Sequence, residues 1–294
     1  MKKFLLLPLL FLASLAWAQV TVKNPLTENQ KNPLGVDVTP RFSWQLVSEK
    51  RNVMQTAYEI RVSDAQSTLA KGNMWNSGKI NSDQSQYVEY KGAPLQSGKK
   101  YFWQVRVWDN AGKPSAWSEA SSWQMGLLNA SDWKAKWIQQ GFAEDTVNRP
   151  SPYFRKTFSV SKKIASATAY ITSLGLYEAF INGKRVGDAY LTPGWTSYNK
   201  RLQYQLYDVT NLIASGNNAI GVALGSGWYR GYIGFSGQHN FYGKELALLA
   251  QIEIQYTDGT KETIITDESW KSNTGAIVSS EIYHGETIDA RKEK

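Results

Sequence analysis

Large aromatic residues and glycines occur together in two segments of the chain, residues 175–198 and 225–235. Large aromatics in glycine-rich loops are poor material for a packed core, but their flat faces can stack on other flat, partly apolar surfaces. The ring of a sugar is such a surface. We therefore predict carbohydrate stacking by Trp195, Trp228, Tyr229 and Tyr232. The alternative for the two tryptophans is core packing, because this residue type is usually highly buried.

Polar residues in and near these segments could bind the hydroxyl groups of the same sugar. A hydroxyl group both donates and accepts hydrogen bonds, so amide, carboxylate and guanidinium groups suit it. The predicted hydrogen-bonding residues are Asn182, Asp188, Arg230 and Glu286. Arg230 could instead stack on Trp228 or pair with Asp289, and Glu286 could pair with an arginine. Tyr198 and Tyr204 are expected in the core.

Hydrolysis of a glycosidic bond with inversion needs a general acid and a general base, with carboxyl groups roughly 6.5–9.5 Å apart. Four carboxylates lie near the aromatic segments, namely Asp188, Glu245, Glu286 and Asp289. Each also suits a turn, a strand edge or an ion pair, and nothing in their spacing defines a catalytic geometry. We therefore assign no catalytic residue.

Other catalytic chemistries have weaker support. Gly225-Ser226-Gly227 is not the five-residue elbow of serine hydrolases, and we expect no helix after it. The absence of cysteine excludes disulfides, thiolate zinc sites and a cysteine nucleophile. Two histidines, His239 and His284, do not make a histidine-rich metal centre by themselves.

The candidate residues fall in a region, residues 134–291, whose pattern predicts an all-β domain. Asn182-Gly183 is the pair that best supports a tight hairpin, and Asp258-Gly259 supports a second one. A helical turn is expected at residues 208–213, ended by Gly216. Alternation of apolar and polar residues predicts a β-sandwich of jelly-roll type. Its predicted strands are 153–158, 166–171, 177–181, 202–206, 219–224, 246–256 and 261–266.

Residues 20–128 predict a separate all-β domain that resembles fibronectin type III and immunoglobulin-like modules. The approach to Tyr101 resembles the corner of such a sandwich, where a tyrosine hydroxyl binds upstream backbone. We interpret this domain as a spacer in which Trp108 and Trp117 pack, and the alternative is a binding module that uses them. Its predicted strands are 42–47, 58–62, 87–90, 101–108 and 122–125, and in the fourth Tyr101, Trp103, Val105 and Val107 share one face.

The junction between the two domains, residues 127–136, contains no run of glycine, serine or proline. Trp133 lies within it and Trp137 directly after it. We expect these two tryptophans to pack the domains together.

The N-terminus has the pattern of a secretory signal peptide, residues 1–18. Two lysines precede the apolar run 4–15, and a small-x-small site ends at Ala18. The run is shorter than the roughly 20 residues of a membrane-spanning helix. Without a cysteine for lipid attachment, we expect a periplasmic or secreted protein with no membrane insertion. The formal charge of +8 is spread along the chain, so no nucleic-acid partner is expected.

Several motifs of the second domain occur together in one order, namely residues 177–188, 191–198, 207–210, 224–231 and 283–291. In residue content and order they resemble the N-terminal region of bacterial α-L-rhamnosidases of glycoside hydrolase family 78. The resemblance covers essentially the whole chain after the signal peptide. It implies an enzyme that hydrolyses terminal α-L-rhamnosyl groups with inversion, in a helical (α/α)6 toroid. No periodic helical sequence is present, so we expect the non-catalytic N-terminal portion of such an enzyme.

The resemblance also implies partners. These are rhamnose-containing glycans or glycosides and the catalytic domains of the same enzyme. Some rhamnose-binding modules of the family hold the sugar through calcium, to which we assign no residues here, and no other cofactor is expected. Alternatives are a free-standing carbohydrate-binding protein or a structural spacer, and the spacer predicts that Trp195, Trp228 and Tyr232 are all buried.

Overall fold

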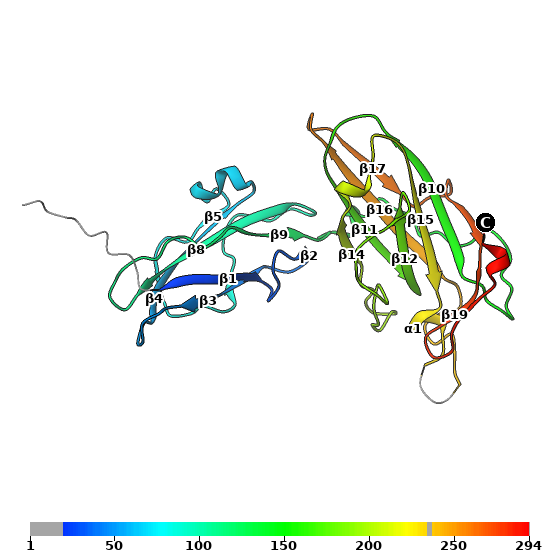
Figure 1. The fold of residues 1–294 in the computed structure, drawn as a ribbon, viewed down its shortest axis with the longest axis horizontal. Helices are drawn as coiled ribbons and strands as arrows, with labels where there is room; N and C mark the ends of the chain where they lie inside the picture. Colours follow the sequence, from blue (N-terminus) through cyan, green and yellow to red (C-terminus); the bar gives the residue numbers. More distant parts are fainter. Residues whose placement is uncertain (1–19, 234–236, 294) are drawn as a thin grey trace, which may run out of the picture. The chain divides into compact units, whose positions relative to one another are not determined.

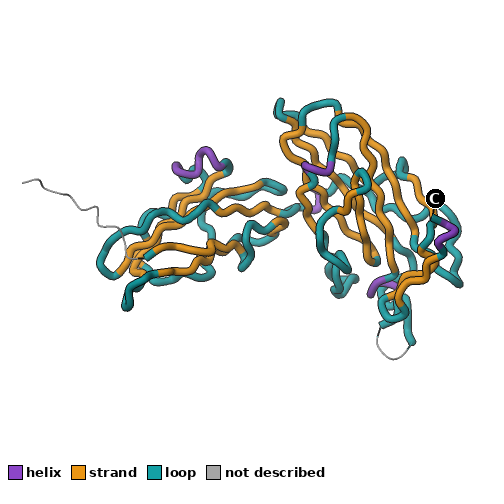
Figure 2. Tube along the Cα trace, viewed as in Figure 1, coloured by secondary structure: helices purple, strands orange, loops and turns teal. Residues whose placement is uncertain are grey.

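The computed structural model describes residues 20–233 and 237–293, so the predicted signal peptide and Phe235 lie outside the described residues. The chain divides into two units between Leu128 and Asn129. Both units consist of sheets joined by loops, with very little helix, and their strands are antiparallel except for the parallel pair β2-β9 in the first unit (Figures 1 and 2). The prediction of an all-β chain of two β-sandwich domains is therefore confirmed.

The first domain has a sheet in the order β1-β3-β7 and a larger one in the order β2-β9-β8-β4-β5, with β6 also paired to β4. The longest strands are β4 and β8, and they pair over eight positions from Gln55↔Asp109 to Ser63↔Phe102. The bounds are β1 (Thr21–Thr27), β2 (Leu34–Val36), β3 (Arg41–Val47), β4 (Gln55–Ser63), β5 (Trp75–Asn76), β6 (Ile80–Asn81), β7 (Val88–Glu89), β8 (Lys100–Asp109) and β9 (Ser121–Met125).

The core of the first domain follows the alternation of β8. Tyr101, Trp103, Val105 and Val107 are fully buried, as the sequence pattern predicts. The Gln96 backbone N–H donates to the Tyr101 hydroxyl at 2.9 Å, so the predicted tyrosine corner is confirmed.

Trp108 and Trp117 lie on the outer face of this sheet and are covered by cations. Trp108 is 9% exposed, and Trp117 is half-buried. The Arg106 guanidinium lies 4.9 Å from the Trp108 ring and 4.8 Å from the Trp117 ring, and Arg61 lies 4.2 Å from Trp117. Such stacking stabilises the sheet face. It favours the packing role predicted for these two tryptophans.

The second domain pairs two sheets face to face, in the orders β13-β12-β15-β10-β18 and β14-β11-β16-β17, with a separate hairpin β19-β20 (Figure 1). Its core includes Phe154, Ile171, Ile220 and Leu248, which alternate inward from both sheets. The bounds are β10 (Pro152–Val160), β11 (Ile164–Leu174), β12 (Leu176–Ile181), β13 (Lys184–Arg185), β14 (Gln205–Asp208), β15 (Gly216–Gly225), α1 (Gly227–Arg230), β16 (Ala247–Tyr256), β17 (Lys261–Ile265), β18 (Lys271–Thr274), β19 (Ile277–Glu281) and β20 (Gly285–Ile288).

The predicted hairpin between β12 and β13 is confirmed. Asn182 and Gly183 have φ values of 52° and 77°, as a tight turn with left-handed central residues requires. The turn at Asp258-Gly259 also connects two paired strands, β16 and β17.

Three local predictions differ from the structure. The expected helical turn is one 3₁₀ turn, Thr210–Leu212, and Gly216 begins β15 instead of ending the turn. The strand predicted at 202–206 lies later, because β14 is defined by its pairing with β11 from Thr168↔Asp208 to Ile171↔Gln205. A short helix, α1, does follow Ser226.

Trp133 packs within the second domain. Its ring contacts Tyr170 at 6.4 Å and Tyr204 at 5.3 Å between ring centroids. Tyr204 was predicted in the core, whereas it is half-buried and packs against Trp133. Trp137 is 45% exposed.

Candidate functional site

The loops that carry most of the predicted site residues meet at one end of the second sandwich. There β12 begins and β15 ends, with Leu176 paired to Gly225. Gly227 has φ 54°, and a Cβ atom on it would lie 2.5 Å from the Leu176 side chain. This close approach requires glycine and lets α1 turn back over the start of β12. The Ser226 N–H donates to the Ser280 carbonyl, which ties β19 to the same end.

A groove of about 490 Å³ opens between β12, β15 and the hairpin β19-β20. Its apolar lining includes Leu176, Leu191, Ile277 and Ile282, and its carboxylates are Glu178, Glu281 and Glu286. Tyr190 also lines the groove, with 78% of its surface exposed. The groove thus combines carboxylate acceptors with apolar surface.

Each carboxylate of the groove is held by one or two neighbouring groups. Glu178 pairs with Arg185 at 3.2 Å, and Arg185 also lies 4.4 Å from the Tyr190 ring. Glu281 accepts the backbone N–H groups of Tyr232 at 2.9 Å and of Tyr283 at 3.4 Å. Glu286 accepts the Ser280 hydroxyl at 3.0 Å. A carboxylate has about four acceptor positions, so each keeps capacity for a ligand hydroxyl.

Trp195 and Trp228 are brought together as predicted stacking residues, but they stack on each other. Their ring centroids lie 5.8 Å apart with 7° between the planes. The Trp195 indole N–H donates to the Tyr242 hydroxyl at 3.2 Å. Trp195 is 51% exposed and Trp228 is half-buried. Trp195 therefore keeps exposed ring surface that a ligand can contact.

Three tyrosines pack together near this tryptophan pair, and one of them, Tyr242, also binds Trp195. Tyr198 contacts Tyr229 at 5.5 Å and Tyr242 at 4.9 Å between ring centroids. Its hydroxyl donates to the Gly194 carbonyl at 2.9 Å. Burial raises the pKa of Tyr198 to about 12, so the phenol stays protonated as a donor. We call these five aromatic residues, namely Trp195, Tyr198, Trp228, Tyr229 and Tyr242, the aromatic platform. Tyr198 thus belongs to this platform, whereas the sequence placed it in the core.

Arg230 anchors the helix that carries Trp228 and Tyr229. The Arg230 side chain is 2% exposed, forms an ion pair with Glu144, and donates to the Ser226 hydroxyl at 3.1 Å. Burial lowers the pKa of Arg230, and Glu144 opposes that shift. The predicted stacking on Trp228 and pairing with Asp289 do not occur, because Asp289 pairs with Arg291 at 2.8 Å.

The remaining predicted residues lie apart from the tryptophan pair. Asn182 is at the far end of β12, where its amide binds the Leu212 carbonyl, the Asn218 side chain and the Ala219 N–H. Asp188 is exposed in the loop before Tyr190. Tyr232 is half-buried between the rings of the two histidines, with centroids at 5.2 and 4.9 Å.

Sequence reasoning missed most of the groove. Glu286 is the predicted site residue that lines it, whereas Glu178, Glu281, Tyr190 and Leu191 were not singled out. Glu178 and Tyr190-Leu191 could have been noticed in the sequence. Glu178 is a charged residue within a predicted strand, and Tyr190-Leu191 is a large apolar pair outside the predicted strands. Glu281 had no such signal, because its position follows from how the C-terminal hairpin packs.

The described residues show no cluster of metal ligands. In residues 20–233 and 237–293 no three His, Asp or Glu side chains are grouped as a metal ion would need. Calcium therefore stays without assigned residues. The same ranges contain no helix long and apolar enough to cross a membrane.

Both domains match known families along their length. Residues 22–129 match the family described as Rha78A-like, N-terminal immunoglobulin domain. Residues 162–294 match the α-L-rhamnosidase N-terminal domain. An α-L-rhamnosidase of Formosa agariphila is 42% identical over 279 residues, which are 91% of this chain and 30% of that protein.

Two solved structures have a fold similar to that of this chain. The α-L-rhamnosidase from Dictyoglumus thermophilum aligns with a TM-score of 0.86 and 39% identity, over 95% of this chain and 32% of its own. The Streptomyces avermitilis α-L-rhamnosidase complexed with L-rhamnose aligns with a TM-score of 0.82 and 28% identity, over 93% of this chain and 43% of its own.

These matches define the class as the two-domain N-terminal region of a glycosidase. The chain carries the N-terminal immunoglobulin-like domain and the rhamnosidase N-terminal domain that are found in α-L-rhamnosidases. It spans about a third of the length of these relatives.

Proposed function

We propose that this chain is the non-catalytic N-terminal portion of an exported α-L-rhamnosidase, and that its second domain recognises terminal L-rhamnosyl groups. Hydrolysis is assigned to the part of the relatives that this chain does not cover. The observation that carries the recognition role is the groove that is lined by three carboxylates and by several apolar side chains. Export rests on the sequence pattern of residues 1–18.

The chemistry of the groove matches the two kinds of group on a deoxy sugar. Rhamnose has hydroxyl groups around its ring and a methyl group in place of a hydroxymethyl group. Carboxylates at Glu178, Glu281 and Glu286 can accept hydrogen bonds from those hydroxyls. The wall that includes Leu176 and Leu191 can bury the methyl group, which favours binding by about 0.8 kcal/mol.

The tryptophan pair gives this end of the domain a second role. Trp195 is 51% exposed and Tyr232 is half-buried, so the condition set for a pure spacer is not met. We assign the exposed ring surface of Trp195 to a neighbouring sugar ring or to the catalytic domains of the same enzyme. Scaffolding of those domains and sugar recognition are compatible on one aromatic platform.

Isothermal titration of residues 19–294 with L-rhamnose and with L-mannose tests the groove. The two sugars differ only by the hydroxyl that L-mannose carries in place of a hydrogen on the methyl carbon. An unpaired hydroxyl against an apolar wall costs about 1–3 kcal/mol. We therefore expect L-rhamnose to bind at least about tenfold more tightly than L-mannose.

Matched variants locate the binding. Glu178→Gln should weaken L-rhamnose binding about tenfold, and Glu49→Gln on the exposed surface of the first domain should leave it unchanged. Leu191→Ala should reduce the preference over L-mannose. Trp228→Ala separates the groove from the aromatic pair. Binding lost in Trp228→Ala but intact in Glu178→Gln and Leu191→Ala would place the sugar on the aromatic platform instead.

The competing function is a free-standing carbohydrate-binding protein. The two functions predict different gene sequences downstream of the codon for residue 294. An open reading frame that continues into periodic helical sequence supports the enzyme, and a stop codon there supports the free-standing protein.

A further inference from the structure

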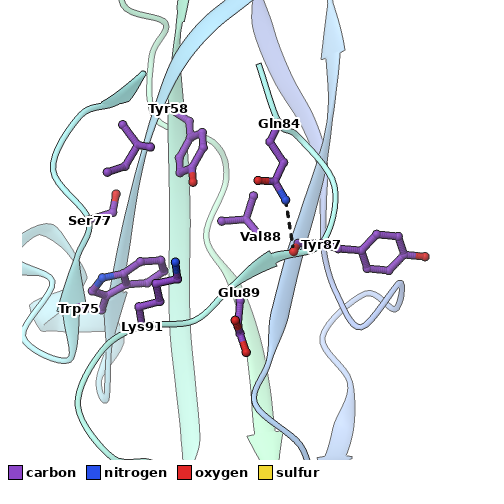
Figure 3. Close-up of a pocket in the computed structure, with 9 residues that line it drawn as sticks. Tyr58, Trp75, Ser77, Gln84, Tyr87, Val88, Glu89 and Lys91 are labelled. Carbon is purple, nitrogen blue, oxygen red and sulfur yellow. Dashed lines mark hydrogen bonds between the residues drawn. The ribbon is translucent and has the colours of Figure 1, made fainter. Parts of the chain in front are cut away.

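The first domain has a pocket of its own at the open edge between its two sheets. The strand β7 ends one sheet, and β5 ends the other. The space between them is a pocket of about 450 Å³ (Figure 3). Its lining includes Tyr58, Trp75, Ser77, Gln84, Glu89 and Lys91. Because this pocket belongs to the first domain, it is separate from the groove of the second.

The aromatic side of the pocket is held rigidly. Trp75 is half-buried and packs edge-on against Tyr90, with ring centroids 5.5 Å apart. Its backbone pairs with Val62 of β4. Tyr58 is 8% exposed and contacts the edge of Trp44 at 5.4 Å. Rings that are already fixed lose little conformational entropy when a ligand packs on them.

The polar groups of the pocket are largely unused by the protein. Within the described residues, the Tyr58 hydroxyl and the Lys91 ammonium have no hydrogen bond or ion pair, and the Glu89 carboxylate, which also has neither, interacts electrostatically with its cross-strand neighbour Arg41. Burial raises the pKa of Tyr58, so its phenol remains a donor. Ser77, in contrast, is fully engaged with Ile60 and Gly78.

The directions of these groups favour one shared ligand. Figure 3 shows the Tyr58 hydroxyl and the Lys91 ammonium on the pocket side, and the Tyr87 ring turned away from it. Gln84 donates its amide hydrogens to the Gln86 carbonyl at 3.0 Å, which leaves its own carbonyl oxygen as an acceptor. Donors and acceptors thus surround an aromatic surface without an excess of either charge.

We propose that this pocket is a second saccharide-binding site, which takes one pyranose ring of a neutral oligosaccharide. Trp75 packs against the apolar face of the ring. Tyr58 and Lys91 donate to ring hydroxyls, and Glu89 and Gln84 accept from them. A pocket with both donors and acceptors discriminates against purely apolar ligands, because they would leave its polar groups unpaired.

Fluorine NMR of the full chain labelled with fluorotyrosine tests this site directly. The chain has 16 tyrosines, and Tyr58→Phe identifies the Tyr58 signal by removing it. The probes are cellobiose, maltose and methyl α-L-rhamnoside. We expect at least one of them to shift the Tyr58 signal saturably. Lys91→Ala should weaken that response about tenfold, and Lys31→Ala, at an exposed position of the same domain, should not.

Two results would overturn the proposal. One is a Tyr58 signal that none of the three sugars moves while the remaining tyrosine signals keep their native dispersion. The other is a response that disappears in Leu191→Ala of the second domain but persists in Lys91→Ala. This site does not depend on the groove, so a chain that fails to bind L-rhamnose in the second domain can still show the Tyr58 response.

Discussion

The two domains use tryptophan in opposite ways. In the first domain, Trp103 and Trp123 occupy inward positions of β8 and β9 and are fully buried. In the second, Trp195 and Trp228 lie outside the strands, where they stack on each other and remain partly exposed. A strand sends every second side chain into the core, whereas a loop has no such constraint. These four tryptophans therefore have different roles, because Trp103 and Trp123 stabilise a core whereas Trp195 and Trp228 form part of a surface.

The largest expected effect is the loss of a core tryptophan. Trp103→Ala should destabilise the first domain by about 3–5 kcal/mol, because it leaves a large cavity. It also removes the indole N–H that donates to the buried Thr27 hydroxyl at 3.0 Å. Trp195→Ala, the matched change on the surface, should cost less than about 1 kcal/mol. Hydrogen exchange read peptide by peptide separates the two domains.

Equal protection losses for the two variants would break this comparison. Such a result would mean that the Trp195–Trp228 pair is part of the structural core of its domain. The sugar-binding role of the platform would then lose its main support, and the groove would have to account for recognition alone.

A second comparison is between a buried and an exposed ion pair, both of which belong to the second domain. Glu144→Ala should destabilise the second domain by about 2–3 kcal/mol, because it leaves the Arg230 charge buried without a partner. The control is Glu268→Ala, which removes an exposed pair with Lys136 and should leave the stability almost unchanged. Chemical unfolding measures both.

The Glu144 variant also tests how α1 holds the aromatic platform. A loosened α1 should lower exchange protection at residues 227–230 before the core strands open. If Glu144→Ala matches Glu268→Ala in both readouts, Arg230 has found another partner and the anchoring role assigned to it is wrong.

Alternation along single strands was enough to predict much of the fold. The inward face of β8 and the positive φ values at Asn182-Gly183 depend only on local sequence, so both could be predicted. The start of β14 and the helix α1 could not be predicted in this way. The start of β14 depends on pairing with β11. The helix α1 is anchored by the ion pair between Arg230 and Glu144, which are 86 residues apart.

The candidate site was less predictable than the fold for the same reason. The aromatic platform carried a compositional signal, and Trp195 and Trp228 do meet. The groove is built from β12, the end of β15 and the C-terminal hairpin, so its carboxylates come from segments about a hundred residues apart in the sequence. No local pattern brings Glu178 and Glu281 together. Only the packing of the hairpin against β15 does.

The smallest predicted effect compares how each domain treats a carboxylate. Burial raises the pKa of Glu253 in the second domain above its ordinary value of 4.5. In the first domain, a hydrogen bond from Asn73 and another from Lys99 lower the pKa of Asp64 below 3.8. Ionised Glu253 therefore costs stability at neutral pH, whereas ionised Asp64 contributes it. We expect Glu253→Gln to stabilise its domain at pH 7 and Asp64→Asn to destabilise its own.

The effects of the two substitutions on stability should disappear in different pH ranges. As the pH falls through the raised pKa of Glu253 toward 4.5, the protein takes up the proton and the advantage of Glu253→Gln disappears. The disadvantage of Asp64→Asn persists to lower pH and is lost only as the pH falls from 3.8 through the lowered pKa of Asp64. Unfolding of both variants and the parent across this range measures the two curves. If both substitutions destabilise the protein at pH 7, Glu253 is solvated in the native state. The two domains would then not differ in how they hold charge.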